Sequence, residues 1–249
     1  MAASSPNDPR FPVLPTLLVM NIFPLVGVLF FHWSFFAIIY IYWWETVIMS
    51  IFNILKMRRA KKPGVPNPNW KINNEVQTVA DVNNKPKLMA TYISIRFFTL
   101  FIYLVFIIVF IGMYSAGQDG YSTAVEIIFF LDTFMQVSIV VVFAYYLIDF
   151  ITWRLSGMEH ETSTSELAVP FDGRSIVMHI VIVLGAVSTS FLGEKLFGSE
   201  QKAAPILFSS FFVLMKTAVD MLSYKTNENR EKLVWKQLWK EESQEEKSE

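Results

Sequence analysis

The feature that most constrains this chain is a series of six apolar blocks, each about 20 residues long or longer. A helix rises about 1.5 Å per residue, so about 20 residues are needed to cross the roughly 30 Å hydrocarbon core of a bilayer. A globular domain would instead interrupt its apolar runs with polar residues every few positions. The sequence therefore predicts an all-α fold, a polytopic membrane helical bundle of about six transmembrane helices. The blocks cover residues 11–31, 35–55, 92–114, 123–151, 175–196 and 203–224.

The links between the blocks are short on one side and longer on the other, which groups the helices into three hairpins. Lys and Arg concentrate in the longer links and in the tail, and such residues are retained on the cytoplasmic side during insertion. This asymmetry predicts that the N- and C-termini are both cytoplasmic. Residues 1–224 are the predicted six-helix transmembrane domain, with a cytoplasmic loop at 56–90, and residues 225–249 are a cytoplasmic tail with the spacing of an amphipathic helix.

Three details of this layout can be compared with a structure. Residues 61–87 are polar and rich in Pro and Asn, which predicts an irregular loop. The block at 123–151 is long for one crossing, which predicts a helix that tilts or projects past the membrane. Besides the lipid bilayer itself, the predicted partner is anionic lipid, contacted through the basic residues Lys56, Arg58, Arg59, Lys61 and Lys62.

Composition excludes several classes of function. The chain has no cysteine, so disulfides, thiolate nucleophiles and Cys-based metal centres are ruled out. A net charge of −1 gives no electrostatic reason to expect a nucleic-acid partner. No HExxH, Walker A, GxSxG or GxGxxG pattern occurs, so no cofactor is predicted and an enzyme is the less favoured interpretation. The oligomeric state is left open.

Several ionisable residues lie within the apolar blocks, although a charge in hydrocarbon is costly and usually faces a bundle interior. Helix direction places a group of them at compatible depths in the inner half of the bundle, with Glu45 near the middle and His179 in the inner third. The predicted polar cluster consists of Glu45, Asn53, His179, Lys216 and Asp220, and the secondary candidates are Asn21, Arg96, Asp132 and Gln136.

The natural ion pair in this cluster is Glu45 with Lys216, because neither charge is tolerable alone in hydrocarbon. A membrane metal site would need two or three His or carboxylate ligands together, so no metal is predicted. The set Glu45, His179 and Asp220 stays as a minor metal-binding alternative.

Three other charged residues lie near the predicted helix ends. Arg96 and Asp149 are expected to extend towards the inner interface, and Glu126 towards the outer one. This interpretation gives their charged groups access to water.

Three classes of function fit such a cluster. A small solute or proton-coupled transporter would use it as a coupling or binding site. A non-catalytic membrane scaffold or assembly protein would use it to hold helices together. An intramembrane enzyme would use it for acid–base or metal chemistry on a lipid-phase substrate. Transporter and scaffold rank nearly level, ahead of the enzyme.

A set of motifs spread over the apolar blocks also resembles a known family. These motifs are Asn21, Pro24, Gly27, Trp33, Tyr42-Trp43-Trp44-Glu45, Asn53, Lys56, His179, Gly185, Lys216 and Asp220. They are similar to a prokaryotic family of polytopic membrane proteins of unknown function, of the domain of unknown function 6498 type. In such relatives an Asn follows the Glu and a His follows the Lys–Asp pair, whereas Thr46 and Tyr224 stand here. The resemblance implies a membrane fold in a prokaryotic cell membrane and no particular activity.

Overall fold

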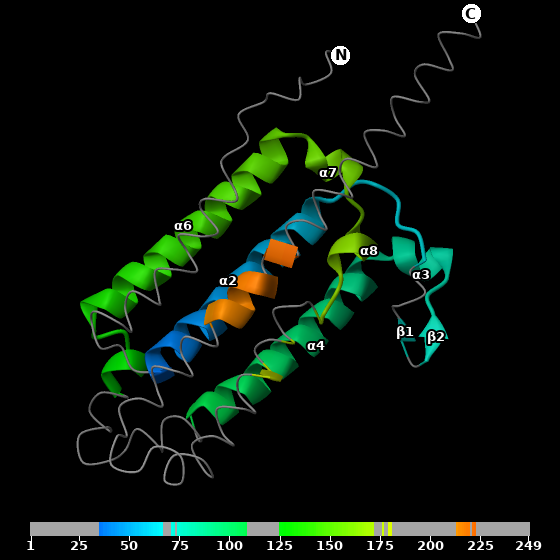
Figure 1. Ribbon diagram of the computed structural model, residues 1–249. Helices are drawn as coiled ribbons and strands as arrows, with labels where there is room; N and C mark the ends of the chain where they lie inside the picture. The colour runs from blue at the N-terminus through cyan, green and yellow to red at the C-terminus, as the bar shows by residue number, and fades with distance from the viewer. Residues whose placement is uncertain are drawn as a thin grey trace, which may run out of the picture.

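The computed structural model describes residues 35–66, 71–72, 74–108, 125–171, 176, 179–180, 213–219 and 221–222. This part of the chain is mostly helical (Figure 1). Its elements are α2 (Phe35–Arg59), β1 (Lys71–Ile72), β2 (Glu75–Val76), α3 (Val79–Asn83), α4 (Lys85–Phe106), α6 (Thr133–Leu155), α7 (Met158–Glu161) and α8 (Thr164–Leu167).

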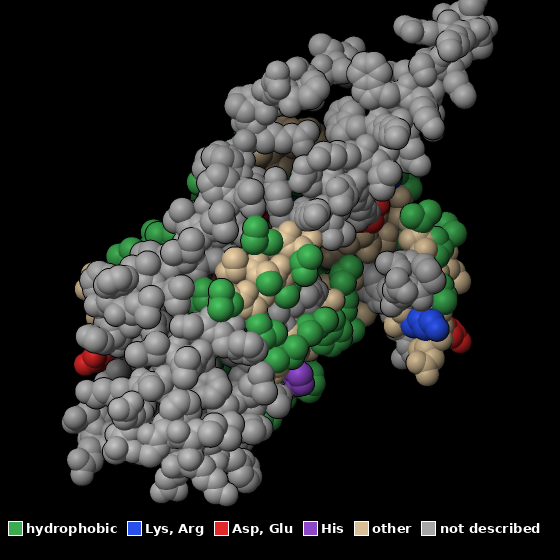
Figure 2. Space-filling model, viewed as in Figure 1, with side chains coloured by type: hydrophobic (Ala, Val, Ile, Leu, Met, Phe, Trp, Pro, Cys, Tyr) green, Lys and Arg blue, Asp and Glu red, His purple; other side chains and the backbone are tan. Residues whose placement is uncertain are grey.

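Three of these helices are long and apolar enough to cross a membrane, namely α2, α4 and α6. They confirm the second predicted block as a helix, and they confirm helix over residues 92–106 of the third block and 133–151 of the fourth. Of the fifth and sixth blocks, residues 176, 179–180, 213–219 and 221–222 are described, and they are helical. The first block and the tail at 225–249 lie outside the described residues, so six crossings and three hairpins stay predictions. On the face in Figure 2, the described side chains along the middle of the molecule are mostly hydrophobic.

Helix α2 lies between α6 and α4 (Figure 1). Two thirds of its apolar stretch (67%) is buried, against 28% for α4 and 22% for α6, so α2 is the central helix. Trp43 on α2 donates a hydrogen bond from Nε1 to the Leu100 carbonyl of α4, over 2.8 Å. Lys56 and Asp149 form an ion pair of 2.7 Å near the ends of α2 and α6. We call the end of the bundle where α2 finishes with Lys56, Arg58 and Arg59 the basic end.

The prediction of one continuous helix over 123–151 is wrong. Residues 125–128 are helical, but the chain then turns through Phe130, whose φ of 53° lies in the left-handed region, and α6 begins at Thr133. Such a backbone costs about 1 kcal/mol or more for a residue other than Gly, so surrounding contacts must hold it. The Gln136 side chain supplies one, because its Nε2 donates to the Phe130 carbonyl over 2.8 Å.

The prediction of an irregular loop over 61–87 is also wrong in part. This stretch holds the β1–β2 hairpin and α3, and α4 starts at Lys85 rather than at Tyr92. Local capping explains both helix starts. The Thr78 hydroxyl accepts a hydrogen bond from the Asp81 amide, and the Asn84 side chain accepts one from the Lys87 amide, with a proline in the first turn of α4.

The link after α6 packs against the basic end, and we call residues 158–171 the docking segment. The Lys61 amide donates to the Glu159 carbonyl over 2.7 Å, and the Thr164 hydroxyl donates to the Met57 carbonyl over 3.3 Å. The segments approach one another closely at Gly64, since a Cβ there would lie 2.3 Å from Val82 Cγ1 and 2.7 Å from Ser165 Oγ. The docking segment therefore joins α2 to α3 at the basic end.

Candidate functional site

The predicted ion pair between Glu45 and Lys216 is present. Lys216 Nζ lies 3.1 Å from Glu45 Oε2, and the Tyr146 hydroxyl donates to Glu45 Oε1 over 3.2 Å. The Lys216 ammonium also lies 4.5 Å from the centre of the Tyr42 ring. The contacts come from α2, α6 and the helical residues 213–219. We call Glu45, Lys216, Tyr146 and Tyr42 the central cluster.

The central cluster is buried near the middle of α2. Only 9% of the Glu45 side chain and 8% of the Lys216 side chain are exposed. Glu45 lies ten residues, or about 15 Å, from the first residue of a helix that is long enough to cross a membrane. Charges so placed are stable only when each has an opposite charge and hydrogen-bond partners, and removing one partner typically costs about 3–5 kcal/mol.

Arg96 forms a second buried site, and the expectation that it extends to the membrane interface is wrong. Only 2% of this residue is exposed. Its Nε donates to the Ser50 hydroxyl and its Nη1 to the Pro170 carbonyl, each over 2.9 Å. The docking segment thus brings a backbone oxygen to the guanidinium, so Arg96 has polar partners inside the bundle.

The other two residues expected at interfaces are exposed. The Asp149 side chain is 47% exposed and pairs with Lys56, and Glu126 is exposed as well. Both positions are compatible with the expected access of these carboxylates to water.

Asn53 holds the docking segment and does not touch the central cluster in any described contact. Its Nδ2 donates to the Leu167 carbonyl over 2.8 Å. Eight residues of helix, or about 12 Å, separate it from Glu45 on the same helix face. The described contact of Asn53 is therefore with the link between helices.

The prediction that His179 lies in the inner third of the bundle is wrong. The structure places its ring 6.0 Å from the Tyr103 ring, centre to centre, and leaves the residue exposed. Tyr103 lies seven residues beyond Arg96, towards the end of α4 that is far from the basic end. The prediction counted depth from a helix that starts at residue 175 at the inner interface. Pro170, nine residues before His179, already lies inside the bundle, where its carbonyl accepts a hydrogen bond from Arg96.

The remaining candidates lie elsewhere. Asp132 and Gln136 are exposed at the start of α6, where the Gln136 amide donates to the Asp132 carbonyl over 3.1 Å. Asn21 and Asp220 fall outside the described residues. Within the part of the chain that the structure describes, no three His, Asp or Glu residues gather closely enough to hold a metal ion.

Sequence reasoning missed three side chains that contact these two sites. Tyr146 and Tyr42 complete the central cluster, and Ser50 binds Arg96. The sequence did hold a signal for Tyr42 and Ser50. Tyr42, Thr46 and Ser50 recur every four residues, so they place polar groups on one face of α2. A tyrosine in an apolar helix also tends to need a partner for its hydroxyl, which is the signal for Tyr146.

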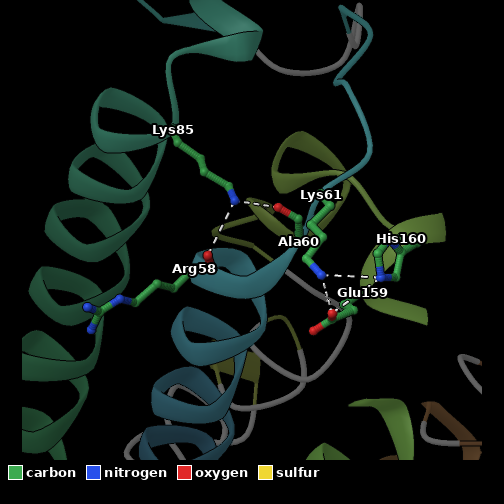
Figure 3. Close-up of polar contacts among 6 residues, drawn as sticks. All are labelled: Arg58, Ala60, Lys61, Lys85, Glu159 and His160. Atoms are coloured by element: carbon green, nitrogen blue, oxygen red, sulfur yellow. Dashed lines mark hydrogen bonds and ion pairs between the residues drawn. The ribbon is translucent and has the colours of Figure 1, made fainter. Parts of the chain in front are cut away.

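The basic end shows a different set of polar contacts (Figure 3). Lys61 Nζ lies 2.5 Å from Glu159 Oε1 and donates to His160 Nε2 over 3.2 Å. Lys85 donates to the carbonyls of Arg58 and Ala60, which are the unpaired acceptors that a helix leaves at its C-terminus.

Two carboxylates of this region titrate below their usual range. The hydrogen bond from Lys61 lowers the pKa of Glu159, and the hydrogen bond from Lys87 lowers the pKa of Asp81. The two carboxylates themselves, Glu159 and Asp81, lie outside the candidate spans.

One family profile, described as a family of unknown function (DUF6498), matches residues 3–246. The chain belongs to this family. The match covers nearly the whole chain and confirms the resemblance that the motifs indicated. No curated protein and no solved structure matches the sequence. For this DUF6498 chain, a function must therefore be argued from the sites themselves.

Proposed function

We propose that this DUF6498 chain is an integral membrane protein that transports a small solute coupled to protons, with the central cluster as the coupling site. The observation that carries the proposal is the buried ion pair of 3.1 Å between Glu45 and Lys216, with Tyr146 on the same carboxylate. Its members come from separate helical segments, so a change in the pair acts on the packing of those segments. Intramembrane charges of this kind commonly mark ion and proton pathways.

The proposed coupling follows from the charge of Glu45. When the carboxylate is ionised, it neutralises Lys216 and holds the segment 213–219 against α2. Protonation removes that attraction and leaves a buried ammonium beside a neutral acid, which favours a different packing or a change in the protonation of Lys216. Two packings with different proton content are the requirement for coupling a proton to a conformational change.

The predicted topology belongs to the same proposal: six crossings, with both termini in the cytoplasm of a prokaryotic cell. Lys56, Arg58 and Arg59 in the last turn of α2 support it, because basic residues favour the cytoplasmic side. A cytoplasm-only reporter fused after Glu249 should be active, and a silent reporter contradicts the orientation.

Transport is tested in liposomes that contain the full-length protein and a trapped pH-sensitive dye. A pH gradient should drive proton flux through the wild type, and Glu45→Gln should lower that flux at least about tenfold by removing the proposed proton-binding carboxylate. Asp149→Asn is the matched control, since it makes the same kind of change in the exposed pair with Lys56. Absence of flux in the wild type, or full flux in Glu45→Gln, contradicts the proposal.

A membrane scaffold is the second candidate, and one observation favours it. Arg96 and Asn53 bind backbone carbonyls of the docking segment, so these polar groups join elements of the fold. A scaffold predicts no pH-driven flux in any variant, together with loss of stability in Arg96→Met. Flux that depends on Glu45 excludes a purely structural role for the central cluster.

A further inference from the structure

Three basic side chains in the last turn of α2 and just after it form no hydrogen bond or ion pair with any residue that the structure describes. They are Arg58, Arg59 and Lys62, and all three are exposed. Their neighbours Lys56 and Lys61 are instead neutralised by carboxylates within the chain. In Figure 3 the Arg58 side chain extends away from the Lys61 contacts. Five basic residues were expected to contact lipid. Of these, only Arg58, Arg59 and Lys62 have no carboxylate partner among the described residues.

An exposed apolar surface lies beside them on the same helix. Ile51 is 45% exposed and Leu55 is 38% exposed, on a helix that is otherwise largely buried. At 100° per residue, Ile51, Leu55 and Arg58 fall within about 60° of one another around the axis. Ser50 faces α4 and Phe52 faces α6 in the described contacts, so this strip occupies a remaining side of α2.

The order of residues along the strip matches the order of groups in a phospholipid. The apolar side chains come first, and Arg58 follows Leu55 by one helical turn, where α2 ends. Aliphatic side chains favour an acyl chain, and arginine binds phosphate oxygens with paired hydrogen bonds. A net positive cluster also favours a headgroup with net negative charge over a zwitterionic one.

We propose that Ile51, Leu55 and Arg58, with Arg59 and Lys62, bind one anionic phospholipid, whose acyl chain lies on the apolar pair and whose phosphate contacts the basic residues. The site rests on the membrane placement proposed above but not on transport, because a scaffold could hold the same lipid. The proposed site uses three of the five basic residues that the sequence predicted to contact lipid. It also adds an apolar contact, through Ile51 and Leu55.

The test uses the full-length protein in nanodiscs that contain equal amounts of phosphatidylglycerol and phosphatidylcholine. Native mass spectrometry after release from the bilayer counts the lipids that stay bound. The wild type should retain phosphatidylglycerol in preference. Each basic residue near an anionic group contributes about a fivefold factor, so Arg58→Gln with Arg59→Gln should lower the preference about 25-fold. Leu55→Ala should lower retention of phosphatidylglycerol by a smaller factor.

The control removes the same number of positive charges from residues outside the proposed lipid site. Lys71→Gln with Lys87→Gln changes residues of β1 and of the start of α4, and it should leave the preference unchanged. The lipid site is overturned if the control lowers the preference as much as the arginine pair, if the arginine variant keeps the wild-type preference, or if the wild type retains both lipids equally. A protein that does not enter the bilayer overturns the membrane placement as well.

Discussion

Among the described residues, ion pairs occur in two regions, and their surroundings differ. In the central cluster, Glu45 and Lys216 are both almost fully buried. At the basic end, Lys61 is exposed to solvent where it meets Glu159. Water and salt reduce an exposed pair to about 0–1 kcal/mol, whereas a buried charge that loses its partner typically costs about 3–5 kcal/mol. The same chemistry therefore makes the two regions unequal in sensitivity to mutation.

The comparison also separates two ways of joining helices. The central cluster joins α2 to residues 213–219 and to α6 through charge and hydrogen bonds within the span. The basic end joins α2 to α3 and the docking segment through backbone hydrogen bonds and close packing at Gly64. We expect charge to dominate in the first region and shape in the second.

The largest expected effect comes from breaking the buried pair on one side. Lys216→Met leaves the Glu45 carboxylate buried without its cation and should lower the free energy of unfolding by about 3–5 kcal/mol. Thermal or denaturant unfolding of the purified protein in detergent measures the loss.

The double variant Glu45→Met with Lys216→Met is the informative control. It removes both charges and keeps apolar volume, so it should recover most of the stability. Equal loss in the single and double variants would contradict a charge-based account of the central cluster.

Much of the span architecture could be predicted because it follows from length and composition. Helices α2, α4 and α6 correspond to apolar blocks long enough to cross a membrane. The partner of Glu45 could be predicted as well, since Lys216 was the opposite charge available at a similar depth. Both inferences rest on strong physical penalties, for unpaired backbone and for unpaired charge in hydrocarbon.

Two of the failures involve contacts between segments far apart in the sequence. Nothing near Arg96 indicates that Pro170, 74 residues later, supplies a carbonyl inside the bundle. The turn at Phe130 is similar, because an apolar residue takes a left-handed backbone only where its surroundings hold it, and its ring lies against Tyr40 and Trp44 of α2. The loop at 61–87 is different: the caps at Thr78 and Asn84 were local signals that Pro- and Asn-rich composition obscured.

An intermediate effect should follow from changing the packing at the basic end. Gly64→Ala introduces a methyl group that would lie 2.3 Å from Val82 Cγ1, so α3 or the docking segment must shift. Overpacking of this kind costs about 1–3 kcal/mol. Val65→Ala is the control, because Val65 is the next residue of the same link and is 68% exposed, so the change crowds nothing. Similar unfolding curves for the two variants would show that shape does not dominate this region.

The smallest effect should come from the two carboxylates of the basic end that pair with exposed lysines. Glu159 and Asp81 have folded-state pKa values below their ordinary values of 4.5 and 3.8, because Lys61 and Lys87 donate hydrogen bonds to them. A lowered folded-state pKa contributes stability that is present above the unfolded value and is lost as the pH falls through the folded value. We therefore expect Lys61→Gln with Lys87→Gln to be slightly less stable than the wild type near neutral pH.

That difference should shrink as the pH falls below about 4 and when salt rises to about 0.5 M, since protonation and screening both remove the attraction. Thermal unfolding of both proteins over this pH range measures it. The two regions differ as proposed only if this loss is smaller than the losses in Lys216→Met and Gly64→Ala. A lysine variant that unfolds as readily as Lys216→Met would mean that the pairs at the basic end are as shielded from water as the central cluster.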